Sequence, residues 1–226
     1  MFGKKRLLIA ASGLTALGAA GAMVAGVTFG LFSATSPAQT QTFTAGTVTL
    51  AQPANAACSI GPINPGDSNA SACTFTADYT GNLPAYIGVD ITVTGTAASS
   101  VPAGYGYAAP TPAPLYDGTA NGLSVTVKSG TTPFMSGQTV NGATLANGAT
   151  VIDLLLSTTP DPSSSVGSPT AHTFTIGYSL PQAAQNQYQG ATAVVSLTIH
   201  AVQSANNGST TGCNAGSQCA GITAWS

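Results

Sequence analysis

The sequence contains very little charge. Only 4% of its 226 residues are Asp, Glu, Lys or Arg, and glutamate is absent. Three of the four basic residues lie at positions 4–6, which leaves Lys128 as the one basic residue in the rest of the chain. Binding to nucleic acid or to an acidic membrane surface depends on clustered Lys and Arg that neutralise phosphates. The composition therefore excludes nucleic acid as a partner, and it excludes a basic membrane-binding patch.

Helical periodicity is the second feature that the sequence lacks. After residue 30, no stretch places apolar residues at the spacing of one helix face. Short β-rich segments, several of which alternate apolar and polar residues, take its place, and Gly, Asn and Pro separate them. From the second cysteine onward, these segments are 73–79, 85–94, 123–128, 149–156, 173–180 and 193–202. The pattern predicts an all-β fold, either a two-sheet antiparallel β-sandwich or a jelly roll, and we expect an N-terminal signal helix before it.

The predicted sandwich domain covers residues 42–203, and a Ser/Asn/Gly-rich C-terminal tail follows at 204–226. We expect long loops at 100–118, which contains four prolines and should be exposed, and at 159–170. The tail is expected to be tied by little beyond a small disulfide ring. The predicted core consists of Phe43, Val48, Leu50, Phe75, Ile87, Val89, Ile91, Val93, Val125, Val127, Leu154, Phe174, Ile176, Tyr178, Val195, Leu197 and Ile199.

Residues 1–30 have the three parts of an export signal, namely a basic start, an apolar stretch and small residues near its end. The basic start is Lys4, Lys5 and Arg6, and Thr28 and Gly30 stand at suitable positions before a cleavage site. There is no twin-Arg pair, so general secretion is favoured over the route for folded proteins. The apolar stretch approaches the roughly 20 residues that span a bilayer. An uncleaved N-terminal anchor, which would be the one attachment to a membrane, therefore stays open as the alternative.

Removal of the leader would leave one lysine and six aspartates, a side-chain charge of −5. The polar surface would then consist mostly of Thr, Ser, Asn, Gln and Gly. Such a surface has little charge repulsion to keep copies of the protein apart. It fits an extracellular protein that associates with itself, and it also fits a protein that is merely soluble.

The four cysteines, Cys58, Cys73, Cys213 and Cys219, all follow the leader. An even number of cysteines in an exported chain indicates disulfides. Of the three possible pairings we predict the local one, Cys58–Cys73 with Cys213–Cys219, because it needs the least loop closure. A zinc site is the alternative, but the chain has no CxxC pair and an exported protein is the wrong setting for it.

The two histidines, His172 and His200, do not form a known catalytic motif. A common zinc peptidase needs two histidines four apart on a helix, with a glutamate as base. His172 shares a strand face with Phe174 and is expected to be half-buried, whereas His200 is expected to face solvent. The two rings can meet across strands, but two ordinary histidines are the simpler interpretation.

Other motifs for catalysis or metal binding are also missing from the sequence. It contains no G-x-S-x-G nucleophile elbow and no D-x-D-x-D calcium loop, so no cofactor is predicted. A calcium ion held by carbonyl groups and one or two Asp stays open as an alternative.

Three stretches, taken in their order and spacing, resemble the TasA/camelysin family of exported bacterial proteins. The first is the leader running into Phe32 and then FTAGTVTL at 43–50. The second is NPGD at 64–67 followed by TGNLPAY at 80–86, and the third is AQNQYQG at 184–190 running into the last strand. The resemblance covers about residues 2–203. The tail with Cys213 and Cys219 and the scarcity of Lys and Glu depart from the better-known members.

The resemblance implies a jelly-roll domain, a leader handled by a SipW-type signal peptidase and, as in several members, fibres of a biofilm matrix or pili. The camelysin name also carries a metallopeptidase label. We therefore predict a secreted structural subunit of extracellular fibres or biofilm matrix, which assembles with copies of itself and is not an enzyme. Two alternatives remain: a secreted camelysin-type metallopeptidase and a monomeric cell-surface binding module.

The segment that signal cleavage would free, residues 31–41, is a candidate donor strand. An added strand satisfies the unpaired N–H and C=O groups of an edge strand, and family members that polymerise in this way support the interpretation. Pro37 has no N–H, so pairing should end near it. A disordered N-terminal tail is the alternative. The candidate donor residues are Leu31, Phe32, Ser33, Ala34, Thr35 and Ser36.

Overall fold

The structure is a computed structural model that describes residues 48, 50–51, 55–103, 109–140, 142–162 and 170–222. The predicted signal segment 1–30, the candidate donor segment 31–41 and Phe43 lie outside these residues. Within them, no helix is long and apolar enough to cross a membrane.

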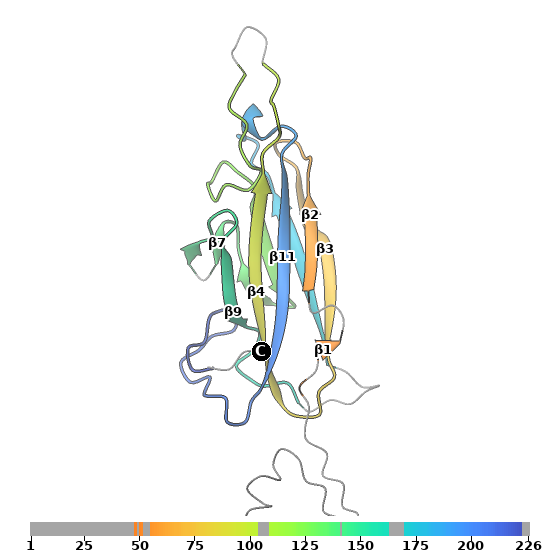
Figure 1. Cartoon of the computed structure of the whole chain (residues 1–226), viewed down its shortest axis with the longest axis vertical. Coiled ribbons are helices and arrows are strands. Elements are labelled where there is room, and N and C mark those ends of the chain that lie inside the picture. Colours follow the sequence, from red (N-terminus) through yellow and green to blue (C-terminus); the bar gives the residue numbers. More distant parts are fainter. Residues whose placement is uncertain are drawn as a thin grey trace, which may run out of the picture. The chain divides into compact units, whose positions relative to one another are not determined.

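The regular secondary structure of the described chain is almost entirely β-strand, which confirms the predicted class. One short 3-10 helix, η1 (Asn186–Tyr188), interrupts a series of antiparallel strands (Figure 1). Sheet A has the strand order β1 (Leu50–Ala51), β3 (Ser68–Tyr79), β10 (Thr170–Ser179), β5 (Ser124–Ser129) and β6 (Thr132–Met135). Sheet B has the order β2 (Asn55–Ile60), β11 (Thr192–Gln203), β4 (Ala85–Thr96) and β9 (Thr150–Leu155). A separate short pair joins β7 (Thr139–Val140) to β8 (Ala143–Thr144).

The two longest strands of sheet B are paired along their whole length. β4 and β11 run antiparallel from Thr96 opposite Thr192 to Ala85 opposite Gln203. Side chains alternate between the two faces of a strand, and β4 accordingly buries Ile87, Val89, Ile91 and Val93, the apolar residues of one face. The alternation in the sequence therefore identified both the strand and its inward face.

Both sheets contribute to one hydrophobic core. Phe174 and Ile176 of β10 in sheet A belong to the same buried cluster as Val89 of β4 in sheet B. Twelve predicted core residues are buried: Ile87, Val89, Ile91, Val93, Val125, Val127, Leu154, Phe174, Ile176, Val195, Leu197 and Ile199. Four more are half-buried and pack against the cluster: Val48, Leu50, Phe75 and Tyr178.

The prediction of an exposed loop at 100–118 is wrong for its last residues. Leu115 and Tyr116 have no exposed surface. The Leu115 carbonyl accepts a hydrogen bond from Leu123 N at 2.8 Å, and the Tyr116 hydroxyl donates to the Leu145 carbonyl at 2.7 Å. A methyl group at Gly95 would lie 2.3 Å from the Tyr116 carbonyl oxygen, so only glycine allows β4 to approach the loop this closely. After its prolines, the loop therefore returns to the core.

The prediction that the tail is tied by little beyond its disulfide ring is also wrong. The tail exchanges two backbone hydrogen bonds with Leu155 at the end of β9, from Leu155 N to Ser217 O at 2.9 Å and from Gly216 N to Leu155 O at 2.7 Å. In Figure 1 the tail lies beside the lower end of β9. It closes a second small hydrophobic cluster that contains Tyr86, Leu155, Val202, Cys219 and Ile222.

Candidate functional site

Both predicted disulfides are present. Cys58 of β2 is bonded to Cys73 of β3, with the two Cα atoms 6.0 Å apart. Because β2 belongs to sheet B and β3 to sheet A, this bond joins the two sheets at one side of the domain. Cys213 is bonded to Cys219, with the Cα atoms 5.3 Å apart, and closes a ring within the tail.

Among the described residues, the outer edge of β3 is the longest strand edge without a partner on the disulfide-linked side. β3 has 12 residues and pairs with β10 on its inner side from Ser68 to Tyr79. On its outer side, the partner within the described residues is β1, which covers only Asp78 and Tyr79. The edge from Ser68 to Ala77 therefore has no strand partner in the part of the chain that the structure describes. Figure 1 shows β3 beside β2, with the short β1 near its lower end.

The register of β1 shows whether the chain that precedes it could cover that edge. Leu50 lies opposite Tyr79 and Ala51 lies opposite Asp78, in antiparallel orientation. A strand continued from Leu50 toward the N-terminus would therefore pass Tyr79 and run off the end of β3. Such a continuation would leave Ser68–Ala77 uncovered, so an extension of β1 toward the N-terminus does not fill this edge.

The opposite side of the domain is covered by the C-terminal tail. Gln218 forms a bridge with Leu154, and its Nε2 donates to the Ile152 carbonyl at 2.9 Å. A methyl group at Gly216 would lie 2.2 Å from the carbonyl oxygen of Pro133 in β6. The disulfide ring of the tail thus contacts the edge strands of both sheets, β9 of sheet B and β6 of sheet A.

The two histidines lie in different sheets, and each is paired with its own aspartate. His172 Nε2 lies 2.5 Å from Asp161 Oδ2, and His200 Nε2 lies 2.8 Å from Asp90 Oδ2. The rings therefore do not meet across strands. His172 is half-buried as predicted, with 15% of its side chain exposed, and His200 is only slightly more open at 23%. Among the described residues, no group of three or more His, Cys, Asp or Glu could hold a metal ion.

A bulge in β9 completes the surroundings of His200. The pairing of β4 with β9 shifts between Val89 and Ile91, and Asp153 adopts a left-handed backbone conformation there, with φ of 56°. Its N–H donates to Asp90 Oδ1 at 2.7 Å. Burial, followed by the nearby Asp90 carboxylate, raises the pKa of Asp153, and His200 partly offsets this rise. Asp90 thus orients both His200 and the bulge.

Sequence reasoning missed both aspartate partners. Asp90 was visible as the charged residue on the polar face of its strand, and His200 shares the outer face of the neighbouring strand. Asp161 lies in a loop without alternation or a motif, so nothing in the sequence indicated that it would pair with His172.

A third polar cluster fixes the loop after the prolines. Asp117 accepts hydrogen bonds from Thr119 N at 2.8 Å, Thr119 Oγ1 at 2.7 Å and the Tyr188 hydroxyl at 2.6 Å. Burial opposes ionisation of Asp117, but the donors Tyr188 and Thr119 outweigh it and hold the pKa of this carboxyl below its usual value. This arrangement stabilises the loop.

The candidate donor residues 31–36 lie outside the described residues, so their pairing stays a prediction. Comparison with family models, with curated proteins and with solved structures finds no match for this chain.

Proposed function

We propose that the chain is a secreted structural subunit of extracellular fibres or of a biofilm matrix, and that its copies join by β-strand addition. In this proposal the domain is a sandwich of jelly-roll type, and a SipW-type signal peptidase removes residues 1–30 after export. The two disulfides support an oxidising compartment outside the cytoplasm. No catalytic role belongs to the proposal, and we expect no chelator-sensitive cleavage of casein by the purified protein.

The observation that carries the proposal is the outer edge of β3. Proteins commonly protect an exposed edge with Lys, Pro, a bulge or a covering segment. The strand from Ser68 to Tyr79 contains neither Lys nor Pro, its one bulge against β10 is confined to residues 70–72, and β1 covers only its last two residues among those described. An edge of this kind is the site at which another chain can add a strand.

The donor would be residues 31–36 of a neighbouring copy. At roughly 3.3 Å per residue, these residues span about 20 Å, which is shorter than the uncovered part of β3. Leu31 and Phe32 would supply apolar contacts, and Pro37 would end the pairing. Signal cleavage exposes this segment only after export, so copies would not assemble inside the cell.

Two comparisons test this function. Mature protein that starts at Leu31 should form fibres visible by electron microscopy and light scattering, and protein that starts at Gln41 should stay monomeric. Thr74→Lys on the edge strand β3 should abolish the fibres, whereas Thr126→Lys on the inner strand β5 should not, although both threonines are exposed. Fibres from the truncated protein, or equal effects of the two lysine variants, would overturn strand addition at this edge.

A further inference from the structure

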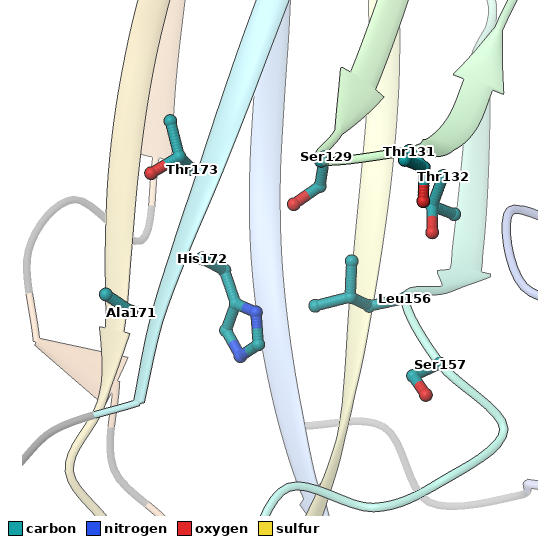
Figure 2. A pocket seen from close by; sticks show the side chains of 9 residues that line it. Ser129, Thr131, Thr132, Leu156, Ser157, Ala171, His172 and Thr173 are labelled. Carbon is teal, nitrogen blue, oxygen red and sulfur yellow. The ribbon is translucent and has the colours of Figure 1, made fainter.

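A pocket of about 460 Å³ lies where the β5–β6 hairpin approaches the start of β10 and the residues that follow β9. Its hydroxyl groups come from Ser129, Thr131, Thr132, Ser157 and Thr173. Figure 2 shows the side chains of Ser129 and Leu156 and the imidazole of His172 gathered around one space. The volume is within the range of small-molecule sites, roughly 300–1,000 Å³.

The imidazole in this pocket is held in one orientation. His172 Nε2 lies 2.5 Å from Asp161 Oδ2, so the Nε2 hydrogen is donated to the carboxylate. Asp161 is itself fixed, because its backbone exchanges hydrogen bonds of 2.7 and 3.1 Å with Ala85 at the start of β4. With the Nε2 hydrogen directed at Asp161, the neutral form of the ring has its lone pair on Nδ1. Among the described residues Nδ1 has no hydrogen-bond partner, so it can accept one from a ligand.

The lining selects an uncharged ligand. None of the residues that line the pocket carries a permanent charge. The carboxylate of Asp161 is only 12% exposed and is occupied by His172. Lys128, the neighbour of Ser129, lies on the opposite face of β5 from the buried Val127. A charged ligand would lose its hydration here without gaining a partner of opposite charge.

The remaining lining residues supply an apolar surface. Leu156 is 7% exposed, and its N–H is bonded to the Ile87 carbonyl at 2.8 Å, which fixes its position. Ala171 adds a methyl group. A pyranose ring has hydroxyl groups around its rim and C–H groups on its faces, which matches a pocket of hydroxyls, one imidazole acceptor and one fixed leucine.

We propose that this pocket binds a neutral sugar unit of an oligosaccharide or polysaccharide. The His172 imidazole and the surrounding hydroxyls hydrogen-bond the sugar hydroxyls, and Leu156 packs against a C–H face. This site is separate from the β3 edge, so it does not depend on fibre formation.

The test uses the monomeric protein that starts at Gln41 and follows its two imidazoles by NMR. The probes are the β-1,4-linked trisaccharides of glucose and of N-acetylglucosamine at about 10 mM, enough to occupy a site with a dissociation constant of about 1 mM. At least one probe should shift the ring signals of His172 and leave those of His200 in place. Trigalacturonate, which has the same size but is charged, should bind at least about tenfold more weakly.

Two serine variants distinguish an effect on binding in the pocket from an effect on folding. Ser129→Ala should weaken binding about tenfold or more without changing the backbone spectrum, and Ser196→Ala on the outer face of β11 should leave binding unchanged. The proposal is overturned if neither neutral trisaccharide shifts His172. It is also overturned if trigalacturonate binds as well as the neutral sugars, or if the two serine variants bind alike.

Discussion

The two sides of the domain close the gap between the sheets in different ways. On one side, the tail supplies backbone groups to β9 and packs Gly216 against β6. On the other side, the Cys58–Cys73 disulfide joins β2 to β3, while the outer edge of β3 from Ser68 to Ala77 has no strand partner within the described chain.

The difference shows that linking two sheets and protecting their edges are separate tasks. A disulfide holds β2 near β3, but it supplies no N–H or C=O group to an unpaired strand edge. The tail does both, because Ser217 and Gln218 bond to β9 while the ring fills space against β6. Within the described chain, the tail therefore occupies the end of β9, whereas no strand occupies the edge of β3 from Ser68 to Ala77.

The largest effect should come from Leu155→Ala on the tail-covered side. Leu155 has no exposed surface and belongs to the small cluster that the tail completes. We expect a loss of about 2–5 kcal/mol in the free energy of unfolding, similar to the loss from Ile91→Ala in the main core. Urea unfolding measures both. If Leu155→Ala cost much less than Ile91→Ala, the tail would not be part of the folded domain.

Removing each disulfide in turn compares how much the two sides contribute to the stability of the fold. Replacing Cys58 and Cys73 together with alanine opens a 15-residue separation, which should cost about 3 kcal/mol in the chain-entropy model. Replacing Cys213 and Cys219 together opens a separation of 6 residues and should cost about 2 kcal/mol. Thermal unfolding of the two double variants gives the order. A larger loss for the tail pair would reverse the comparison.

Alanine substitutions at two glycines of the tail measure how much its contact with β6 contributes to stability. Gly216 and Gly212 both have positive φ, 77° and 82°, so alanine at either site should cost about 1 kcal/mol in backbone strain. At Gly216 the added methyl group would also meet Pro133, whereas nothing lies within 4 Å of one at Gly212. We expect Gly216→Ala to destabilise the protein by about 1 kcal/mol more than Gly212→Ala. Equal losses in urea unfolding would show that the tail does not contact β6.

The smallest effect concerns Asp117, whose loop bonds are independent of either side. Its folded pKa is below the unfolded value, so its stabilisation is complete above the unfolded pKa and is lost as pH falls through the folded pKa. Tyr188→Phe removes one donor and should cost about 1 kcal/mol at neutral pH. The cost should begin to shrink below about pH 4, where the Asp117 carboxyl of the unfolded chain takes up a proton, and it should be lost once pH falls through the lower folded pKa. A cost that does not change between neutral pH and pH 3 would show that this hydrogen bond does not depend on the charge of Asp117.

The features predicted correctly from the sequence are those that depend on side-chain alternation and on short loops, namely the strands and the disulfides. Alternation identified the strands that became Ala85–Thr96 and Thr192–Gln203, and the short separations between cysteines identified both disulfides. The closure of the β9 side was not predictable, because Gly216 and Ser217 act through backbone groups, which leave no pattern in side chains. The same limit applies to Asp161, which reaches His172 from a loop.

Residue-resolved amide hydrogen exchange, measured on the monomer and on the assembled protein, tests the contrast between the two sides most directly. In the monomer, the amide of Leu155, bonded to Ser217, should exchange more slowly than the outward-directed amides of Ser68–Ala77. On assembly, protection should rise along Ser68–Ala77 and remain unchanged in β9. Equal protection of the two edges in the monomer, or new protection confined to β9 and the tail on assembly, would contradict the account.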